Sequence, residues 1–273
     1  MQNRNFMLYT ALFAILTSLF SCKMDEETTL PAQKENIRIN MMATSEFFPK
    51  EFTSLNKVYF DHINKDSAQF LGSHFPERPY PSIPVGNEFN VLYTRLNSGN
   101  RKIIFTNAKD SILYHAQHDF LPNGTYNLLI ADDVVQDSTK IQYRNVFSDD
   151  SEPAQSGKIG VKFINLSPDS GALTVFQNLK SGDKKQIRTL DFSQSTSYMF
   201  LDEQSVVSNG IIPFSFRNDK KKIFFETGIS FKPGINYLII LKGLAYPKLK
   251  KNSKNQYFYS DKTLTAVNRI VQS

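Results

Sequence analysis

The side chains that most often perform catalysis or bind metals are few in this sequence and widely separated. The only close histidine pair is His115 and His118, and adjacent acidic residues occur at Asp132-Asp133 and Asp149-Asp150. If the two histidines lie on a strand, their offset of three residues places the rings on opposite faces, which disfavours a shared metal ion. Paired carboxylates in loops can bind calcium, but solvated turns explain these pairs equally well. We therefore expect surface histidines, no metal site and no cofactor.

Catalytic motifs are absent from the sequence. It contains no Gly-x-Ser-x-Gly elbow, no His-Glu-x-x-His, no phosphate-binding P-loop and no dinucleotide fingerprint. The segment Ser167-Pro168-Asp169 could contribute to binding. However, proline fixes φ and a neighbouring Asp can close a local hydrogen bond, so we expect this segment only to shape a turn. We predict that the protein is not an enzyme, with an unrecognised hydrolase as a remote alternative.

A proline-rich segment at residues 75–84 is the strongest candidate for a binding loop. It reads FPERPYPSIP, and four prolines at this density make a stiff, extended chain that loses little entropy on binding. Arg78 and Tyr80 would then form a hydrogen-bonding and stacking edge. The alternative, which we favour, is a rigid strap whose Phe75 and Ile83 cover the core.

The chain opens with a leader that ends at its single cysteine. Arg4 precedes an apolar run from Phe6 to Leu19, which is shorter than the ~20 residues that a membrane-spanning helix needs. The following residues, Leu19-Phe20-Ser21-Cys22, resemble the bacterial lipobox. That resemblance implies a signal peptide at residues 1–21, cleavage before Cys22, and linkage of the Cys22 sulfur to diacylglycerol.

Acidic residues follow the proposed lipidation site. Asp25, Glu26 and Glu27 resemble the export signal of lipoproteins that Bacteroidetes-type bacteria send to the outer face of the outer membrane. The alternative is an ordinary solvated tether. We expect residues 22–35 to form a lipidated, flexible stalk that attaches the protein to the outer membrane, facing the cell exterior.

The mature sequence has two similar halves, which indicates a domain duplication. A Pro/Gly turn precedes a tyrosine-bearing apolar strand at residues 122–130 and again at 233–240, and the opening strands at 37–45 and 159–167 are also alike. Two further pairs of segments look equivalent: 102–105 with 222–225, and 143–150 with 257–261. A polar stretch at 149–157 separates the halves, so we predict domains at 36–150 and 157–273.

Short strand-like runs recur in both halves, and beyond the leader no sustained helical periodicity appears. We predict strands at residues 37–42, 58–63, 89–96, 103–106, 111–115, 126–131 and 141–147 in the first half, and at 159–165, 173–177, 187–190, 198–201, 212–216, 222–225, 237–241 and 256–259 in the second. About seven short strands per domain are typical of an immunoglobulin-like β-sandwich. The predicted fold is all-β, with two such domains in tandem.

The start of the second half resembles a known family. Residues 158–170, KIGVKFINLSPDS, look like the opening of the domain-of-unknown-function family number 4397, in which a basic strand leads into a Ser-Pro-Asp turn. The second half resembles the family throughout, whereas residues 40–45 of the first half lack the Pro-Asp. The resemblance implies an exported, often tandem, immunoglobulin-like module, and it supplies no catalytic residues.

These observations lead to two expectations of function. The formal net charge of +6 is spread over short, separate clusters, so a nucleic-acid partner is not expected. The first expectation is a non-catalytic binding module at the cell surface, whose partners are the membrane, through its lipid, and a glycan or surface protein. The alternative is a structural subunit of an envelope or fimbria-like assembly, joined by strand addition.

Overall fold

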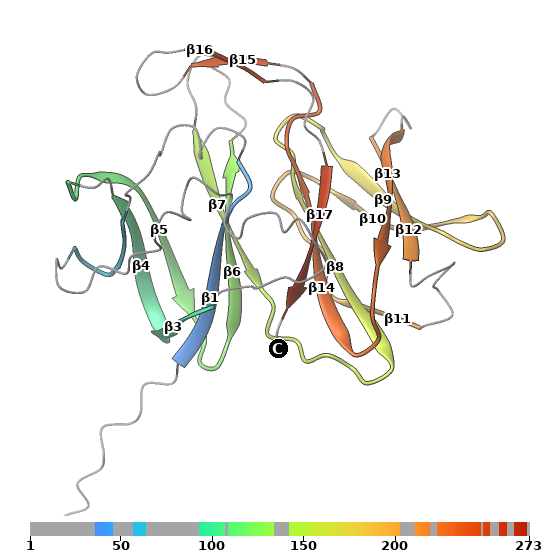
Figure 1. The fold of residues 1–273 in the computed structure, drawn as a ribbon, viewed down its shortest axis with the longest axis horizontal. Coiled ribbons are helices and arrows are strands. Elements are labelled where there is room, and N and C mark those ends of the chain that lie inside the picture. The colour runs from blue at the N-terminus through green and yellow to red at the C-terminus, as the bar shows by residue number, and fades with distance from the viewer. Residues whose placement is uncertain are drawn as a thin grey trace, which may run out of the picture. The chain divides into compact units, whose positions relative to one another are not determined.

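The computed structural model describes residues 36–45, 57–63, 93–106, 109–133, 142–202, 211–218, 223–246, 248–251, 257–260 and 265–271, and all of its regular elements are strands (Figure 1). Within these residues, no helix is long and apolar enough to cross a membrane. Several predicted features lie outside the described residues: the leader 1–21, its Leu19, Phe20 and Ser21, the lipidation site Cys22, the acidic residues Asp25, Glu26 and Glu27, and the candidate binding residues Arg78 and Tyr80.

The first half forms two sheets. One has the order β3-β1-β6-β7 and the other the order β2-β4-β5. The first strand and β6 pair in parallel, and the other pairs are antiparallel. The bounds are β1 (Asn36–Ala43), β2 (Lys57–Phe60), β3 (Thr94–Asn97), β4 (Gly99–Thr106), β5 (Ile112–Phe120), β6 (Thr125–Asp132) and β7 (Tyr143–Asp149).

The second half repeats this plan. Its sheets have the orders β11-β8-β14-β17 and β10-β9-β12-β13, and β8 again pairs in parallel with β14. A separate two-stranded sheet joins β15 and β16. The bounds are β8 (Lys158–Leu166), β9 (Leu173–Asn178), β10 (Lys184–Leu190), β11 (Met199–Asp202), β12 (Ile211–Arg217), β13 (Ile223–Ser230), β14 (Ile235–Lys242), β15 (Lys248–Lys251), β16 (Tyr257–Ser260) and β17 (Thr265–Val271).

Equivalent tyrosines make the same hydrogen bond in both halves. The hydroxyl of Tyr126 in β6 accepts the backbone N–H of Leu121 at 3.0 Å, and that of Tyr237 in β14 accepts the N–H of Lys232 at 2.9 Å. In each case the donor lies five residues upstream, on the far side of the Pro/Gly turn. The predicted equivalence of residues 122–130 and 233–240 is therefore confirmed by sheet position and by this contact.

Two other predicted equivalences are wrong. The strand that occupies the place of β7 in the second half is β17, which pairs with β14 as β7 pairs with β6, whereas residues 257–260 form β16 in the small sheet. Likewise, residues 102–105 belong to the central strand β4, while residues 223–225 begin the edge strand β13. Short aromatic and basic runs suit any pleated strand, so local similarity does not specify which neighbour a strand pairs with.

Each half has its own apolar core, formed by alternate residues of facing sheets. In the first half, Ile39, Ile103 and Leu128 are among its fully buried members. In the second, Phe163 lies edge-on to Phe214, with ring centroids 5.0 Å apart. Alternation along each strand sends every second side chain into these cores.

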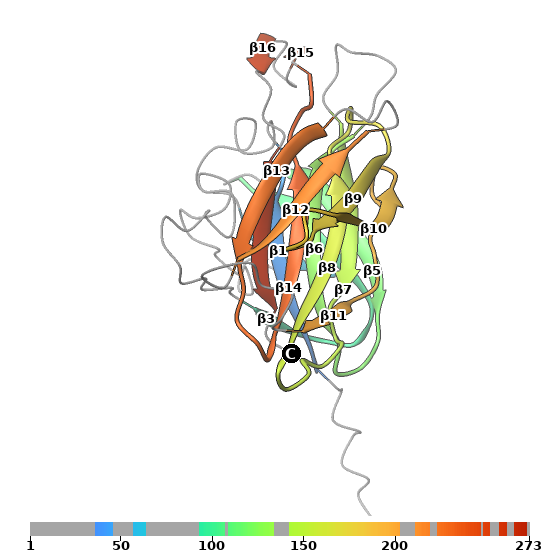
Figure 2. The same ribbon diagram turned by 90° about the vertical axis from the view of Figure 1, so that its right-hand side faces the viewer.

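The sheets that contain β6 and β14 are also buried on the face that points away from their own core. Every residue of β6 is buried, and so are all residues of β14 except the first. Their second faces meet in a third apolar cluster that includes Leu129 and Val146 from the first half and Ile164, Leu238 and Ile240 from the second. Residues 35–273 accordingly form one compact unit. Figure 2 shows the strands as successive layers, with β12 in front of β14 and β8, and β6 behind them.

Strands buried on both faces explain the near-continuous apolar runs of β6 and β14. The sequence pattern predicted both strands but not their second buried face. It also missed β15 and β17, and it began β10 at residue 187 rather than Lys184. All residues of β10 except Ile187 and Leu190 are exposed, so its sequence gives little hydrophobic pattern to detect.

We expect Ile240→Ala to lower the free energy of unfolding by about 2–5 kcal/mol, because it removes a fully buried side chain from the cluster between the halves. Leu121→Ala, at a side chain that is 65% exposed, should change it by less than about 0.5 kcal/mol. Urea unfolding followed by circular dichroism measures both, since the chain has no tryptophan. Equal effects of the two variants would contradict a buried interface between the halves.

Candidate functional site

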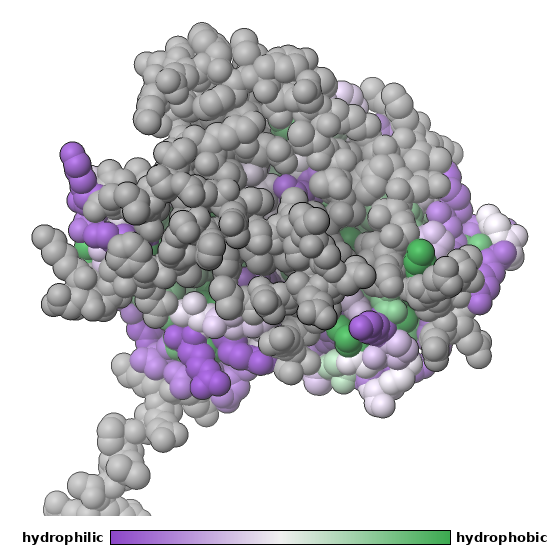
Figure 3. All heavy atoms as spheres, in the orientation of Figure 1, coloured by the Kyte–Doolittle hydropathy of each residue, from purple (hydrophilic) through white to green (hydrophobic). Residues whose placement is uncertain are grey.

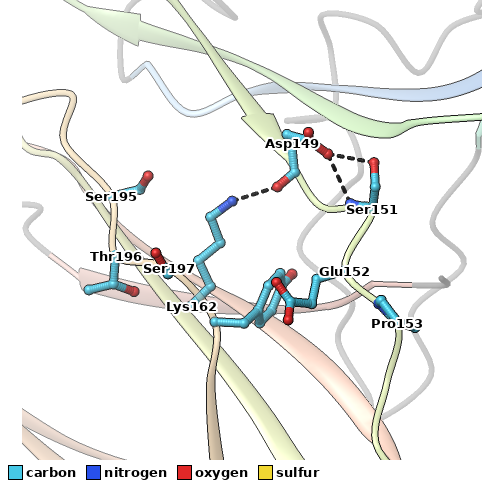
Figure 4. A pocket seen from close by; sticks show the side chains of 9 residues that line it. Asp149, Ser151, Glu152, Pro153, Lys162, Ser195, Thr196 and Ser197 are labelled. Carbon is cyan, nitrogen blue, oxygen red and sulfur yellow. Dashed lines mark hydrogen bonds between the residues drawn. The ribbon is translucent and has the colours of Figure 1, made fainter. Parts of the chain in front are cut away.

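A cleft lies where the linker between the halves meets the second half. Its volume is about 590 Å³. Figure 4 shows linker side chains on one side, Ser195 and Thr196 on the other, and Lys162 of β8 between them. The lining residues are Asp149, Ser151, Glu152, Pro153, Lys162, Ser195, Thr196, Ser197 and Tyr198.

A fully buried carboxylate, Asp150, lies behind this cleft. Its Oδ1 accepts hydrogen bonds from Ser148 Oγ at 2.9 Å, Lys162 Nζ at 3.1 Å and the Tyr198 hydroxyl at 3.1 Å. Its Oδ2 accepts one from Asn127 Nδ2 at 2.6 Å. The donors come from both halves of the chain, and four bonds satisfy a carboxylate that water does not reach.

The lysine that faces Asp150 is almost as well buried as its partner. The Lys162 side chain is 9% exposed, and its ammonium also donates to the backbone oxygen of Asp149 at 2.7 Å. The ammonium lies 5.4 Å from the centre of the Tyr198 ring, within range of a cation–π contact. Burial raises the pKa of Tyr198, and the neighbouring Asp150 charge raises it further, so this hydroxyl remains a proton donor. We call Asp150, Lys162, Tyr198, Asn127 and Ser148 the buried latch.

The polar interactions extend from the latch into the first half. Asn127 of β6 accepts a hydrogen bond at its Oδ1 from Asn40 Nδ2 of β1, at 2.6 Å. Those two residues are register partners in the parallel β1–β6 pair. The chain of contacts therefore runs from the first strand of the first half, through Asp150, to Lys162 in the first strand of the second half.

The linker itself is fixed by hydrogen bonds to both halves. The backbone N–H of Asp150 donates to Thr125 O at 2.7 Å, and the Ser151 hydroxyl accepts the Thr125 N–H at 2.9 Å. On the other side, Asn236 Nδ2 donates to the backbone oxygen of Glu152 at 2.7 Å. The residues between β7 and β8 are therefore held in place by contacts with both halves.

The acidic pairs are largely structural. The expectation of a solvated turn is wrong for Asp150, since its carboxylate is fully buried, and the four protein donors occupy the oxygens that a calcium ion would need. Asp132 is also buried and accepts a hydrogen bond from the Ser45 hydroxyl. Asp133 forms an ion pair with Arg144 at 3.1 Å. Among the described residues, no group of three or more His, Cys, Asp or Glu side chains is placed to hold a metal ion.

The histidine pair lies on β5, and its rings take opposite faces as predicted. His115 is exposed, whereas His118 faces the core side and stacks on Phe147 with ring centroids 4.2 Å apart. Burial lowers the pKa of His118, partly offset by the charges of Asp119 and Asp149. The expectation of a surface residue therefore holds for His115 and is wrong for His118, which belongs to an aromatic cluster.

The Ser-Pro-Asp turn has a structural role, as expected, but through longer-range contacts than predicted. Asn165 Oδ1 accepts the Ser167 N–H at 3.1 Å and closes the local turn. The Asp169 carboxylate instead accepts the backbone N–H groups of Ala245 and Tyr246, at 2.7 and 3.1 Å. It thereby fixes the segment after β14 to the turn after β8.

Few large apolar side chains are exposed on the described surface. Among the residues that Figure 3 colours by hydropathy, hydrophilic ones predominate and hydrophobic ones form only small spots. The large exposed apolar side chains lie in different parts of the chain: Ile63, Ile112, Leu121, Leu179 and Tyr246.

A second, smaller cleft of about 250 Å³ lies beside the ion pair of Arg101 and Asp61, in which Arg101 Nη1 and Asp61 Oδ2 are 2.6 Å apart. Neither cleft could be predicted from local sequence patterns, because the lining residues of each come from segments that are distant in the sequence.

Comparison with known families gives one match. Residues 88–176 match the family described as Domain of unknown function (DUF4397). The match includes the residues 158–170 on which the predicted resemblance rested. However, it begins in the first half, crosses the linker with Asp150 and Lys162, and ends within β9, so it coincides with neither predicted domain. No curated protein matches the chain.

We expect Lys162→Met to lower the free energy of unfolding by about 3–5 kcal/mol, because it leaves Asp150 charged and buried without its cation. Lys158→Met breaks an ion pair of largely exposed groups, with Asp202, and should cost less than about 1 kcal/mol. Urea unfolding measures both. In addition, the double variant Asp150→Asn with Lys162→Met should have a higher free energy of unfolding than Lys162→Met alone. If the double variant instead loses as much free energy of unfolding as the two single variants together, the pairing of Asp150 with Lys162 is contradicted.

Proposed function

We propose that the protein is a non-catalytic binding module of the bacterial cell surface, attached to the outer membrane through lipid on Cys22. The observation that carries the proposal is that the only cysteine of the chain stands directly after Leu19-Phe20-Ser21, at the end of an apolar leader. Each buried acyl methylene contributes about 0.8 kcal/mol, so two or three chains hold a protein on a membrane essentially permanently. The acidic residues Asp25, Glu26 and Glu27 support an outward-facing location.

Within this proposal, each half is an immunoglobulin-like sandwich. Supporting features are the two facing sheets per half, the short strands and the tyrosine hydroxyl that bonds to a backbone N–H before its strand. A tyrosine that bonds upstream backbone in this way is frequent in such sandwiches. The fold type alone implies no activity.

A binding role is favoured over catalysis by the chemistry of the described cleft. Its lysine is committed to Asp150, and its serines have no histidine beside them in the lining. A nucleophilic serine requires an adjacent base, so the cleft lacks that arrangement. Polar groups on a rigid scaffold are instead suited to holding a ligand. The expected ligands are a glycan or a surface protein.

The alternative is a structural subunit joined to its neighbours by strand addition. The described edge strand β10 argues against addition at that edge, because Lys184, Lys185 and Arg188 are exposed along it. Charged residues on an edge oppose pairing with another strand. We therefore place the binding module first.

We expect the wild-type chain to incorporate a palmitate analogue in cells, and Cys22→Ser to abolish the label, because no other thiol is present. Ser18→Ala, which changes the leader outside the lipobox, should retain it. Gel fluorescence and membrane fractionation measure both, and protease added to intact cells should digest the wild-type protein. Label retained by Cys22→Ser would exclude the proposed anchor.

We expect the detergent-extracted full chain to bind at least one glycan or envelope protein saturably and to leave it chemically unchanged. Surface plasmon resonance against a panel measures binding, and mass spectrometry of the recovered ligand detects turnover. A chemically altered ligand would replace the proposal with an enzyme. Regular ladders of the chain after cross-linking on intact cells, without ligand binding, would favour the structural alternative.

A further inference from the structure

We propose that the cleft between the linker and the segment 195–198 is a carbohydrate-binding site that takes a neutral sugar through its hydroxyl groups. The inference rests on the proposed binding function and gives it a place and a ligand class. The volume, about 590 Å³, falls within the ~300–1,000 Å³ of small-molecule sites.

Several polar groups of the cleft make no hydrogen bond with the described residues. The side chains of Glu152, Ser195 and Ser197 are exposed and make no hydrogen bond within the described part of the chain. Asp149 uses Oδ1 to accept two bonds from Ser151, while its Oδ2 makes none with the described residues. The cleft therefore presents two carboxylates that accept and two hydroxyls that both donate and accept.

This set of groups determines the chemistry of the ligand. Anions are disfavoured, because Lys162, the one cation among the described lining residues, is already paired with Asp150. Apolar ligands find few apolar side chains, because Pro153 and the Tyr198 ring are the only large apolar groups among the described lining residues. A basic side chain would satisfy the carboxylates and can donate to the serine oxygens, but it leaves the serine O–H groups without an acceptor. Adjacent sugar hydroxyls satisfy both kinds of group.

The walls of the cleft are held in place before any ligand arrives. The Thr196 hydroxyl accepts the Phe163 N–H at 3.0 Å, and its own N–H donates to Phe163 O at 2.9 Å. Ser195 pairs with Ile164 as an isolated β-bridge. On the opposite side, Asp150 and Asn236 hold the linker. A preformed wall loses little conformational entropy on binding, which matters for a ligand bound mainly by hydrogen bonds.

The test uses the detergent-extracted full chain and immobilised neutral oligosaccharides of glucose, galactose, mannose and N-acetylglucosamine, with oligolysine as a basic probe. We expect saturable binding of at least one sugar, weakened at least tenfold by Ser197→Ala combined with Glu152→Gln. Neither residue belongs to the buried latch. The matched control, Ser156→Ala with Asp119→Asn, changes two exposed residues elsewhere and should bind as the wild type does.

A second measurement is independent of the variants. Hydrogen exchange with and without the sugar should show added protection in residues 149–153 and 195–198. Sugar binding that survives the cleft variant and is lost in Tyr80→Ala would overturn this inference and leave the proposed function intact. Binding of oligolysine alone would overturn the ligand class. A protein partner captured on cells, with no sugar bound, would likewise overturn only the inference, whereas a protein without lipid and without any ligand would overturn the proposed function.

Discussion

The carboxylate of Asp150 has no contact with water, and its charge is compensated entirely by protein groups. Lys162 and Tyr198 of the second half, and Ser148 and Asn127 of the first, donate to it. A buried charge is tolerated only when such partners are in place, so the sheets of both halves must be correctly positioned together. Formation of the latch is thus coupled to docking of the two halves.

The latch lies beside an apolar interface. The sheets β3-β1-β6-β7 and β11-β8-β14-β17 each bury one face in their own core and the other in the shared cluster around Leu129 and Ile240. Burial of apolar surface stabilises the docked halves but is non-directional. The hydrogen bonds of the latch, by contrast, are directional. Together they give a unit in which the relative position of the halves is defined, unlike tandem domains joined by a free linker.

The cleft is a consequence of this arrangement. The linker begins at the buried Asp150 and leads into β8. Between these points it passes opposite residues 195–198, which precede β11, and leaves a polar cleft over Lys162. The latch residues form its rigid base, and the side chains that they do not use face outward from the linker and from segment 195–198. The binding site that we propose in this cleft would use residues of the linker and of the second half, which a single copy could not supply.

The sequence by itself determined most of the strands, the duplication and the turn before β6 and β14, because these follow from alternation, turn residues and a repeated tyrosine, all of which are local. It did not distinguish Asp149 from Asp150, although one is exposed and the other fully buried. Nor did it separate β16 from β17, or recognise that His118 stacks on Phe147. Each of these depends on contacts between segments that are distant in the sequence. Lys162 and Tyr198 contact Asp150, β17 pairs with β14, and β7 packs beside His118. Local pattern sets the face on which a side chain lies, whereas only the tertiary structure decides what meets that face.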